Sequence, residues 1–320
     1  VCEGPITGFT RIWRNQKLVY DGRPGSAWGA KNNKTFLKKF KLYTGAWDQM
    51  PDPTLESIWG VGRVPAYPFS TMSVLAHLGP IARTVEDAAF MLSIIGRPDA
   101  RDIMAWNTPC PDYTRELDLG VRNRRIAYAP RLSYVDHVDP DVAAAVEKAA
   151  QSFVDLGAVV EEAAPDFDDP RDLCDTLWHT GAALAMKHVT PQMESMLDPG
   201  LLREVRNGRA ITGAQYLEAY LARAALATKM AAFHEKYDLL LTPQMPTGAV
   251  PLGADTPPGG PYKHWIEWSP FTYPFNITQQ PAATAPCGFT RDGLPIGLQI
   301  VGRMREDMLV LAAARAFERA

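Results

Sequence analysis

TYPFNITQQPAATAPCGFTRDGLPIGLQIVG, residues 272–302, is the stretch that decides the fold of this 320-residue chain. Asp292-Gly293 lies between two strand-like runs and is the kind of dipeptide that forms a tight turn between two strands. Residues 307–320 follow with the spacing of an amphipathic helix. The C-terminal part is therefore predicted to be two strands joined by a tight turn and followed by a helix.

A helix is also predicted upstream, between Thr84 and Gly96. Thr84 is a good N-cap, and Asp87 stands three residues later, in the place of a capping-box acid. Gly96 stops the helix. The apolar positions recur at helical spacing: Val85, Ala88, Ala89 and Leu92. These residues are interpreted as cap and scaffold rather than as catalytic groups.

The middle of the chain reads as a strand, a helix and a strand. Residues 125–128 form the first strand, and Asp139-Pro140 begins the helix as an N-cap followed by proline. Gly157 ends the helix, and the next strand starts at residue 158. The predicted buried face of the helix consists of Val142, Val146, Ala149, Ala150 and Phe153. The chain has neither a GxGxxG nor a GxxxxGK[ST] loop, so this unit is scaffold.

Two long helices are predicted next, over residues 171–197 and 213–236. A buried strand at 238–242 enters a Pro/Gly-rich loop that runs from 243 to 261. Connections of this length without structure are often functional.

Composition excludes several classes of protein. Hydrophobic residues make up 46% and the net charge is −3, which is typical of a globular protein and gives no indication of nucleic-acid or membrane binding. The four cysteines are dispersed, which indicates reduced thiols and a cytoplasmic location. The histidines lack metal-ligand spacing, so no metal and no cofactor are expected. The sequence begins with Val and has no signal peptide or long apolar run.

Charge divides the chain near residue 63. Residues 1–60 hold nine of the 33 basic residues but only five of the 36 acidic ones, and the remainder is acidic. Runs at 10–13 and 17–20, separated by Asn15-Gln16, predict a β-hairpin, and residues 35–43 predict another strand whose lysines lie on a solvated edge. We therefore expect a short β-rich segment over 1–62 and a second domain over 63–320.

Residues 63–320 resemble the amidase signature family. The resemblance rests on GRVPAYP (62–68), LGPIARTVEDAA (78–89), IGRPDARD (95–102) and the closing stretch quoted above. Gln279 departs from the pattern, because many members carry glycine there. The resemblance implies an α/β fold with a mixed, twisted sheet and helices on both faces, incomplete at its front. It also implies hydrolysis of linear carboxamide or acylamide bonds by a Ser–cis-Ser–Lys triad, without metal or cofactor.

In that family the triad lies upstream of the GRVP stretch, on a Gly/Ser-rich loop, and this sequence has no GGSSGGS-like run. Ser26, in the turn-forming run 24–27, has no serine–glycine cluster after it. A triad of Ser70 or Ser73 with His77 and Asp87 has unfavourable spacing. We therefore assign no catalytic residue, and expect the chain to be weakly active or inactive.

The first 62 residues resemble a segment of tailed-phage tail proteins. The similarity rests on VCEGPI (1–6), YTG (43–45) and DQMPDP (48–53), and in that family the segment is structural. The tetrapeptide 64–67, VPAY, also occurs in both families, which makes it a candidate point of joining. A structural tail component with an accidental amidase-derived C-terminus is one alternative function, and a ligand-binding remnant is the other.

The substrate-binding residues are expected just after the long loop, where aromatic side chains gather. The candidates are Trp265, Trp268, Phe271, Tyr273 and Asn276. An apolar pocket for an acyl or aryl group is the functional interpretation, and sealing of the core edge is the structural one. The expected partner is a small-molecule amide, with no nucleic acid and no membrane. Self-association through exposed core is expected as well, because the incomplete sheet leaves strand edges and apolar faces open.

Overall fold

A computed structural model describes residues 11–14, 17–21, 75, 77, 79–98 and 108–320. The chain divides into two compact units, residues 1–71 and residues 72–320. The predicted boundary after residue 62 lies outside the described residues and stays a prediction.

The described part of the first unit is a β-hairpin. Strands β1 (Arg11–Arg14) and β2 (Lys17–Asp21) pair antiparallel, and Arg14 pairs with Lys17 next to the turn. The hairpin predicted around Asn15-Gln16 is therefore confirmed. The strand predicted over 35–43, the turn at 24–27, and both Ser70 and Ser73 lie outside the described residues.

A five-stranded mixed sheet forms the centre of the second unit. Its strands are β3 (Arg125–Tyr128), β4 (Val159–Glu162), β5 (Leu239–Pro243), β6 (Ala282–Phe289) and β7 (Pro295–Gly302), in the spatial order β4-β3-β5-β7-β6. The β3 pairings with β4 and β5 are parallel, whereas β7 pairs antiparallel with both β5 and β6. Every residue of β5 is buried, which requires cover on both faces of the sheet.

The β6–β7 hairpin confirms the turn predicted from Asp292-Gly293. Phe289 pairs with Pro295, and the amide of Gly293 donates to the carbonyl of Thr290 at 2.9 Å. Gly293 has a φ of 81°, a left-handed conformation that glycine adopts without steric cost. The glycine at the turn is therefore consistent with the register in which β6 and β7 pair.

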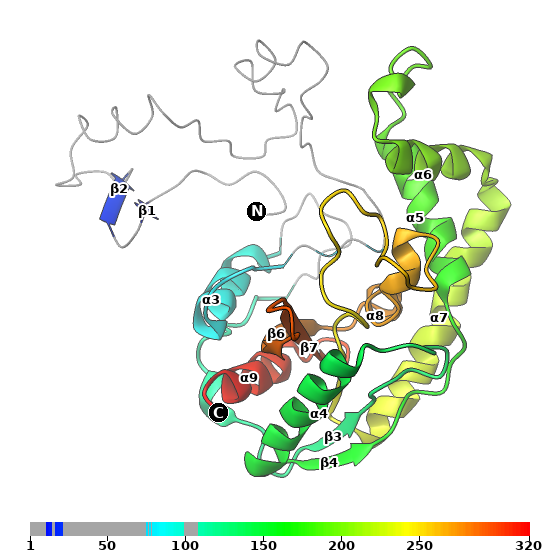
Figure 1. Cartoon of the computed structure of the whole chain (residues 1–320). Coiled ribbons are helices and arrows are strands. Elements are labelled where there is room, and N and C mark those ends of the chain that lie inside the picture. The colour runs from blue at the N-terminus through cyan, green and yellow to red at the C-terminus, as the bar shows by residue number, and fades with distance from the viewer. Residues whose placement is uncertain (1–10, 15–16, 22–74, 76, 78, 99–107) are drawn as a thin grey trace. The chain divides into compact units, whose positions relative to one another are not determined.

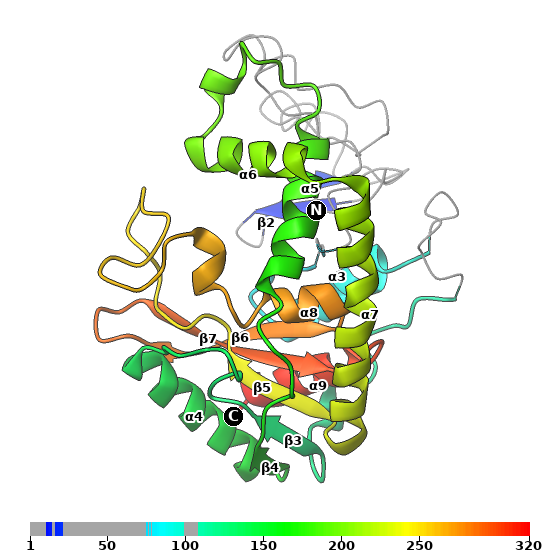
Figure 2. The ribbon, with the colours of Figure 1, turned by 90° about the vertical axis from the view of Figure 1, so that its right-hand side faces the viewer.

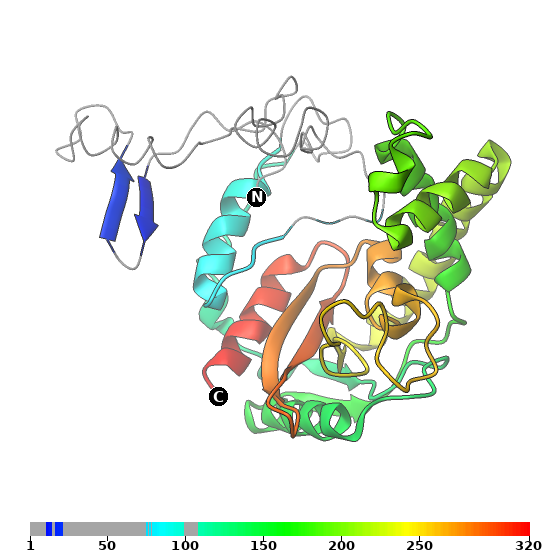
Figure 3. The same ribbon diagram turned by 45° about the horizontal axis from the view of Figure 1, so that its top comes forward.

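Helices cover both faces of the sheet, as predicted. Helices α4 (Pro140–Asp155) and α9 (Asp307–Glu318) lie on one face, and α5 (Arg171–Ala185), α7 (Gly213–Lys236) and α8 (Tyr273–Thr278) lie on the other (Figures 1 and 2). Figure 3 shows α9 alongside β6 and β7, with α3 (Val85–Ile95) beyond it. The two face layers bury the apolar side chains of the strands between them.

The caps predicted for α3 and α4 and the apolar face predicted for α4 are present. Thr84 accepts the amide of Asp87 at 3.1 Å, and Asp139 accepts the amide of Asp141 at 2.8 Å ahead of Pro140. All five residues of the predicted α4 face are buried, and the Phe153 ring stacks on Phe317 of α9 with centroids 5.5 Å apart. This packing joins α4 to α9 over the sheet.

The helix predicted over residues 171–197 is wrong in its extent. Helix α5 ends at Ala185, a short 3₁₀ turn follows (Glu194–Met196), and a separate helix, α6, spans Pro199–Ala210. Asp198 caps α6 by accepting the amide of Leu201 at 3.0 Å, and proline stands at its first position. The predicted span 171–197 contains Pro191, and a proline and the residue before it do not continue a helix, so one helix cannot run through to residue 197.

None of the helices in the described part of the chain combines the length and apolar character that crossing a bilayer requires.

Helices α5 and α6 meet at a glycine, which gives a test of the packing. A Cβ on Gly208 would lie 1.8 Å from the carbonyl oxygen of His179, whereas a Cβ on Gly213 would meet nothing within 4 Å. We expect Gly208→Ala to lower the free energy of unfolding by at least ~2 kcal/mol, because the two helix backbones would have to separate. Urea unfolding measures the effect.

Gly213→Ala is the matched control and should leave stability unchanged or raise it by up to ~1 kcal/mol. Equal effects of the two substitutions would contradict the close approach of α5 and α6.

Candidate functional site

The five predicted substrate-binding residues lie on one short segment of the second unit. Trp265 and Trp268 belong to a 3₁₀ turn, η3 (Trp265–Trp268), and Tyr273 and Asn276 belong to α8. Phe271 lies between these two elements. The segment follows the long loop 243–261 and leads into β6, so it passes over the sheet beside α5 and α7 (Figure 2).

The two tryptophans are half-buried and have different contacts. The Trp265 ring packs against Trp178 of α5, with centroids 5.4 Å apart. Trp268 donates its indole N–H to the carbonyl of Asp255 in the long loop at 3.0 Å. Trp265 therefore joins η3 to α5, and Trp268 fixes one point of the loop.

Phe271 is completely buried, and its backbone is fixed to the sheet. Its carbonyl accepts Nε2 of Gln299 at 2.7 Å, and the same Nε2 donates to Oγ1 of Thr242 at 2.9 Å. The side chain packs in the main hydrophobic core. Phe271 thus anchors the segment, and its neighbours Trp268 and Tyr273 are placed by that anchor.

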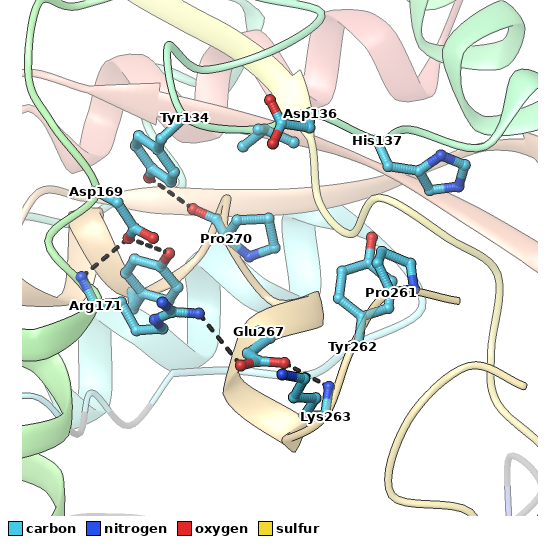
Figure 4. Close-up of a pocket in the computed structure, with 12 residues that line it drawn as sticks. Tyr134, Asp136, His137, Asp169, Arg171, Pro261, Tyr262, Lys263, Glu267 and Pro270 are labelled. Carbon is cyan, nitrogen blue, oxygen red and sulfur yellow. Dashed lines mark hydrogen bonds and ion pairs between the residues drawn. The ribbon is translucent and has the colours of Figure 1, made fainter. Parts of the chain in front are cut away.

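Tyr273 lines a cavity of about 330 Å³ (Figure 4). Of the five predicted residues, Tyr273 is the one that lines this cavity. The other lining residues are Tyr134, Val135, Asp136, His137, Asp169, Arg171, Pro261, Tyr262, Lys263, Glu267 and Pro270. The lining is therefore aromatic and charged rather than wholly apolar.

Asp169 joins two elements at this cavity. The hydroxyl of Tyr273 donates to Oδ1 of Asp169 at 2.6 Å, and the backbone N–H of Arg171 donates to the same oxygen at 3.0 Å (Figure 4). Asp169 thus accepts one hydrogen bond from the first residue of α5 and another from the first residue of α8, and so joins the starts of the two helices. Burial raises the pKa of Tyr273, and the nearby Tyr134 and Asp169 raise it further.

Glu267 forms a second junction at the other side of the cavity. Nη1 of Arg171 lies 3.4 Å from Oε1 of Glu267, and Oε2 accepts the backbone amides of Lys263 and His264. Burial opposes the charge of this carboxylate, but the two amides and the Arg171 cation outweigh burial, so the pKa of Glu267 is lowered. The carboxylate is therefore ionised and holds η3 against α5.

Tyr134 completes the lining. Its hydroxyl donates to the carbonyl of Pro270 at 2.9 Å, and its ring stacks on Tyr273 with centroids 6.4 Å apart. Burial raises the pKa of Tyr134 as well, so both tyrosines keep their protons and act as hydrogen-bond donors. The described lining contains no serine or cysteine. The described lining therefore offers no nucleophile of the kind that amide hydrolysis uses.

Asn276 lies on α8 away from this lining. Its Oδ1 is 3.2 Å from Nδ1 of His77. His77 was one member of the alternative Ser–His–Asp arrangement, and its imidazole contacts Asn276 and the carbonyl of Leu75. These contacts give His77 a role in holding α8.

The assignment of the five residues to substrate binding stays a prediction. The structure brings Tyr273 together with Asp169, Arg171 and Glu267, three residues that the sequence analysis did not single out. Glu267 stands between the two predicted tryptophans, and Asp169 precedes a proline and a helix start. Those positions are the only local signals that could have indicated them.

The described residues contain no group of three His, Cys, Asp or Glu side chains placed to hold a metal ion. The described cysteines Cys110, Cys174 and Cys287 are free thiols. Burial raises the pKa of Cys174 to about 12 and that of Cys287 to about 11. Neither thiol is therefore activated as a nucleophile.

The lowered pKa of Glu267 makes a prediction about pH. A carboxylate whose pKa is lowered on folding stabilises the folded state at pH values above its usual pKa of 4.5. This stabilisation is lost as the pH falls through the lowered pKa of the folded state. We expect Glu267→Gln to be less stable than the parent at neutral pH, and the difference to shrink below about pH 4.5. Urea unfolding at several pH values measures it.

Glu147→Gln is the control, because Glu147 is exposed on α4. A stability difference for Glu267→Gln that stays constant from pH 7 to pH 3 would contradict the assignment.

Known proteins are similar to this chain over most of its length. An acylamidase of Rhodococcus erythropolis is 33% identical over 249 residues, covering 76% of this chain and 52% of that protein. A glutamyl-tRNA(Gln) amidotransferase subunit of Myxococcus xanthus is 31% identical and covers 77% and 55%. The crystal structure of a bacterial aryl acylamidase of the amidase signature family superposes with a TM-score of 0.66 at 28% identity, covering 75% and 52%.

The chain thus spans about half the length of the curated relatives it matches. The sequence model of the Amidase family matches residues 60–311, which is most of the chain. The mixed sheet with its two helical layers agrees with the fold of the solved relatives. By sequence and by fold, this chain belongs to the amidase family.

Proposed function

We propose that residues 63–320 form the scaffold and one wall of the substrate cleft of an amide hydrolase that acts on linear carboxamide or acylamide C–N bonds. The match of the Amidase family model over residues 60–311 carries this proposal. The names of two relatives, an acylamidase and an aryl acylamidase, favour acylamides as the substrate class.

The segment from Trp265 to Asn276 is the part of the wall that would meet the substrate. Trp265 presents a half-buried ring beside Trp178, and Tyr273 carries a protonated hydroxyl at the polar cavity. An aromatic surface beside a polar cavity suits an acyl or aryl group attached to a polar amide. This arrangement supports binding and leaves the chemical step to other groups.

The chemical step needs a nucleophile, a base and oxyanion donors. The sequence has no Gly/Ser-rich run with paired serines, and the described lining of the polar cavity offers neither serine nor cysteine. We therefore propose that this polypeptide, as it stands, hydrolyses amides weakly or not at all. In a second form of this proposal, the chain is a remnant that retains the cleft wall and binds ligands without hydrolysing them.

The first 62 residues are proposed as a separate structural segment of the phage-tail type. The Amidase match begins at residue 60, and the hairpin of β1 and β2 belongs to the other compact unit. Reading the genomic DNA across residues 55–70 tests the join. A continuous amidase gene with a GGSSGGS-encoding stretch upstream would contradict it, and a tail gene that runs into this point would support it.

The purified chain should show no turnover of acyl anilides above the rate without enzyme. A fluorophosphonate probe, which labels activated serines, should leave it unlabelled. The acylamidase of Rhodococcus erythropolis serves as the positive control for both measurements. Quenching of tryptophan fluorescence by an unhydrolysed anilide would support the ligand-binding variant, through Trp265 or Trp268.

Turnover that the fluorophosphonate abolishes would overturn the proposal of an inactive chain. It would leave the family assignment intact, because that assignment rests on the sequence match and the fold.

We further propose that the chain self-associates through helix α3. Its sequence, VEDAAFMLSII, is mostly apolar, yet Ala89 is its one buried residue. Phe90 is 59% exposed and Ile94 is 43% exposed, while Ile81, which precedes the helix, is 97% exposed. Apolar side chains gathered on one exposed helix are typical of an interaction surface.

The double substitution Phe90→Glu and Ile94→Lys should therefore shift the chain toward monomer, because charges on this face oppose its burial. Light scattering coupled to size-exclusion chromatography, over a range of protein concentrations, measures the change. Leu252→Glu in the long loop, where the leucine is fully exposed and lies on no helix, is the control and should leave the distribution unchanged. A parent chain that is monomeric at every concentration would contradict this proposal.

A further inference from the structure

Helix α7 has one side packed against the protein and an opposite side that carries exposed leucines. The packed side meets α5 and α8, and it includes the buried residues Leu226 and Met230 (Figure 2). On the opposite side, Leu217 is 55% exposed and Leu221 is 61% exposed. Large apolar side chains on the open side of a long helix are typical of an interaction surface.

The open side forms a continuous stripe with the spacing of a helix–helix seam. Its members are Leu217, Leu221, Ala224, Thr228 and Ala232, which follow one another at intervals of three or four residues, and all five are exposed. Residues at these intervals lie along one side of a helix and can face a second helix over several turns. The Thr228 hydroxyl donates to the carbonyl of Ala224 at 2.9 Å, so it needs no partner outside the helix.

The sizes of the side chains along this stripe are self-complementary. The two leucines stand in its N-terminal half, and smaller side chains occupy the rest from Ala224 onward. In an antiparallel pair of α7 helices with a two-fold axis at Ala224, Leu221 of one copy lies level with Thr228 of the other, to within one residue. Leu217 then lies level with Ala232 in the same way. A large side chain opposite a small one lets two helices approach closely without leaving a void.

The charges beside the stripe are complementary in the same arrangement. Glu218 and Lys229 are both exposed, and they lie on the same flank of the stripe because eleven positions are close to three full helical turns. Neither side chain has an ion pair or a hydrogen bond among the described residues. In an antiparallel helix pair, residues on the same flank of the two helices face one another. Glu218 of each copy therefore faces Lys229 of the other, which makes two opposite-charge pairs across the axis.

We propose that the open side of α7 binds the same surface of a second copy of this chain, with the two helices antiparallel and the two-fold axis at Ala224. The interface is isologous, because each copy contributes the same residues to it. The size pattern and the charge pattern select this occupant together, since both are complementary to themselves about one axis.

The α7 surface is separate from the apolar surface of α3. Helix α3 packs on α9, which covers one face of the sheet, whereas α7 covers the other face (Figures 1 and 2). The two surfaces share no residue, so the inference depends neither on self-association through α3 nor on the amide-hydrolase proposal. Either interface can fail while the other stands.

The first test uses the full chain with Phe90→Glu and Ile94→Lys, in which the α3 surface is blocked. Light scattering coupled to size-exclusion chromatography, over a range of protein concentrations, should show a dimer that dissociates on dilution. Adding Leu221→Glu should raise the dissociation constant of this dimer at least tenfold, because it places a charge in the seam twice. Adding Leu252→Glu instead should leave the constant unchanged. A monomer at every concentration before Leu221→Glu is added would overturn the proposal.

Charge reversal in the same background tests the antiparallel register. Glu218→Lys or Lys229→Glu alone sets like charges opposite each other in both pairs and should weaken the dimer roughly tenfold. The two substitutions together restore opposite charges and should return the dissociation constant to its starting value. Lys148→Glu, at an exposed position of α4, is the control and should have no effect.

A mixture of the two single variants gives a second reading of the register. Each pair between Glu218→Lys in one copy and Lys229→Glu in the other again joins opposite charges, so the two variants should form a mixed dimer in preference to either homodimer. Native mass spectrometry of the mixture measures the proportions. In 1 M NaCl this preference should shrink, because the charges are screened.

Three results would each overturn the proposal. A dimer that Leu221→Glu leaves intact would place the contact elsewhere. A double charge reversal that fails to restore the dimer, or a mixture that gives the three dimers in statistical proportions, would contradict the antiparallel pairing. The substituted α7 positions are all exposed, so the variants should fold, and urea unfolding of each one checks this.

Discussion

The buried amide of Gln299 is the interaction on which the rest of the second unit depends. Gln299 lies in β7, is 3% exposed, and donates from one nitrogen to Thr242 of β5 and to the carbonyl of Phe271. A buried amide without partners costs about 1–3 kcal/mol, so both acceptors must be in place when β7 docks. One side chain thereby sets the β5–β7 register and fixes the start of the segment that leads into α8. The lining of the polar cavity follows from where that segment is held.

The elements that the sequence predicted correctly have local causes. Thr84 and Asp139 cap their helices through the next few residues, and Gly293 closes a turn between adjacent strands. Gln279 ends α8 with a φ of 58°, a left-handed conformation that glycine favours, which explains locally why many members of the family carry glycine there. Helix α6, which was not predicted, has a local cause as well, since Asp198-Pro199 is a helix start signal.

The candidate site was harder to predict because its contacts are not local. Asp169 and Tyr273 are 104 positions apart, and Arg171 and Glu267 are 96 apart. No period or turn signal in the sequence relates such pairs; the fold brings them together when α5 packs beside α8. Asp169, Arg171 and Glu267 are, moreover, partnered by one another or by neighbouring protein groups, so these three residues show how the wall is held rather than which bond is broken. Family membership and catalytic competence are therefore separate conclusions for this chain.

Helix α8 is held at both of its ends. It has six residues; its first, Tyr273, lines the polar cavity, and its last, Thr278, lines a second cavity of about 520 Å³ beside the last turns of α7. Both ends are fixed, by the Asp169 carboxylate at Tyr273 and by the Pro274 carbonyl and the Gln280 side chain at Thr278. Arg223 of α7 also donates to the carbonyl of Ile277 at 3.0 Å. A short helix held at this many points is a rigid support, so the position of Tyr273 in the polar cavity depends on contacts at both ends of α8.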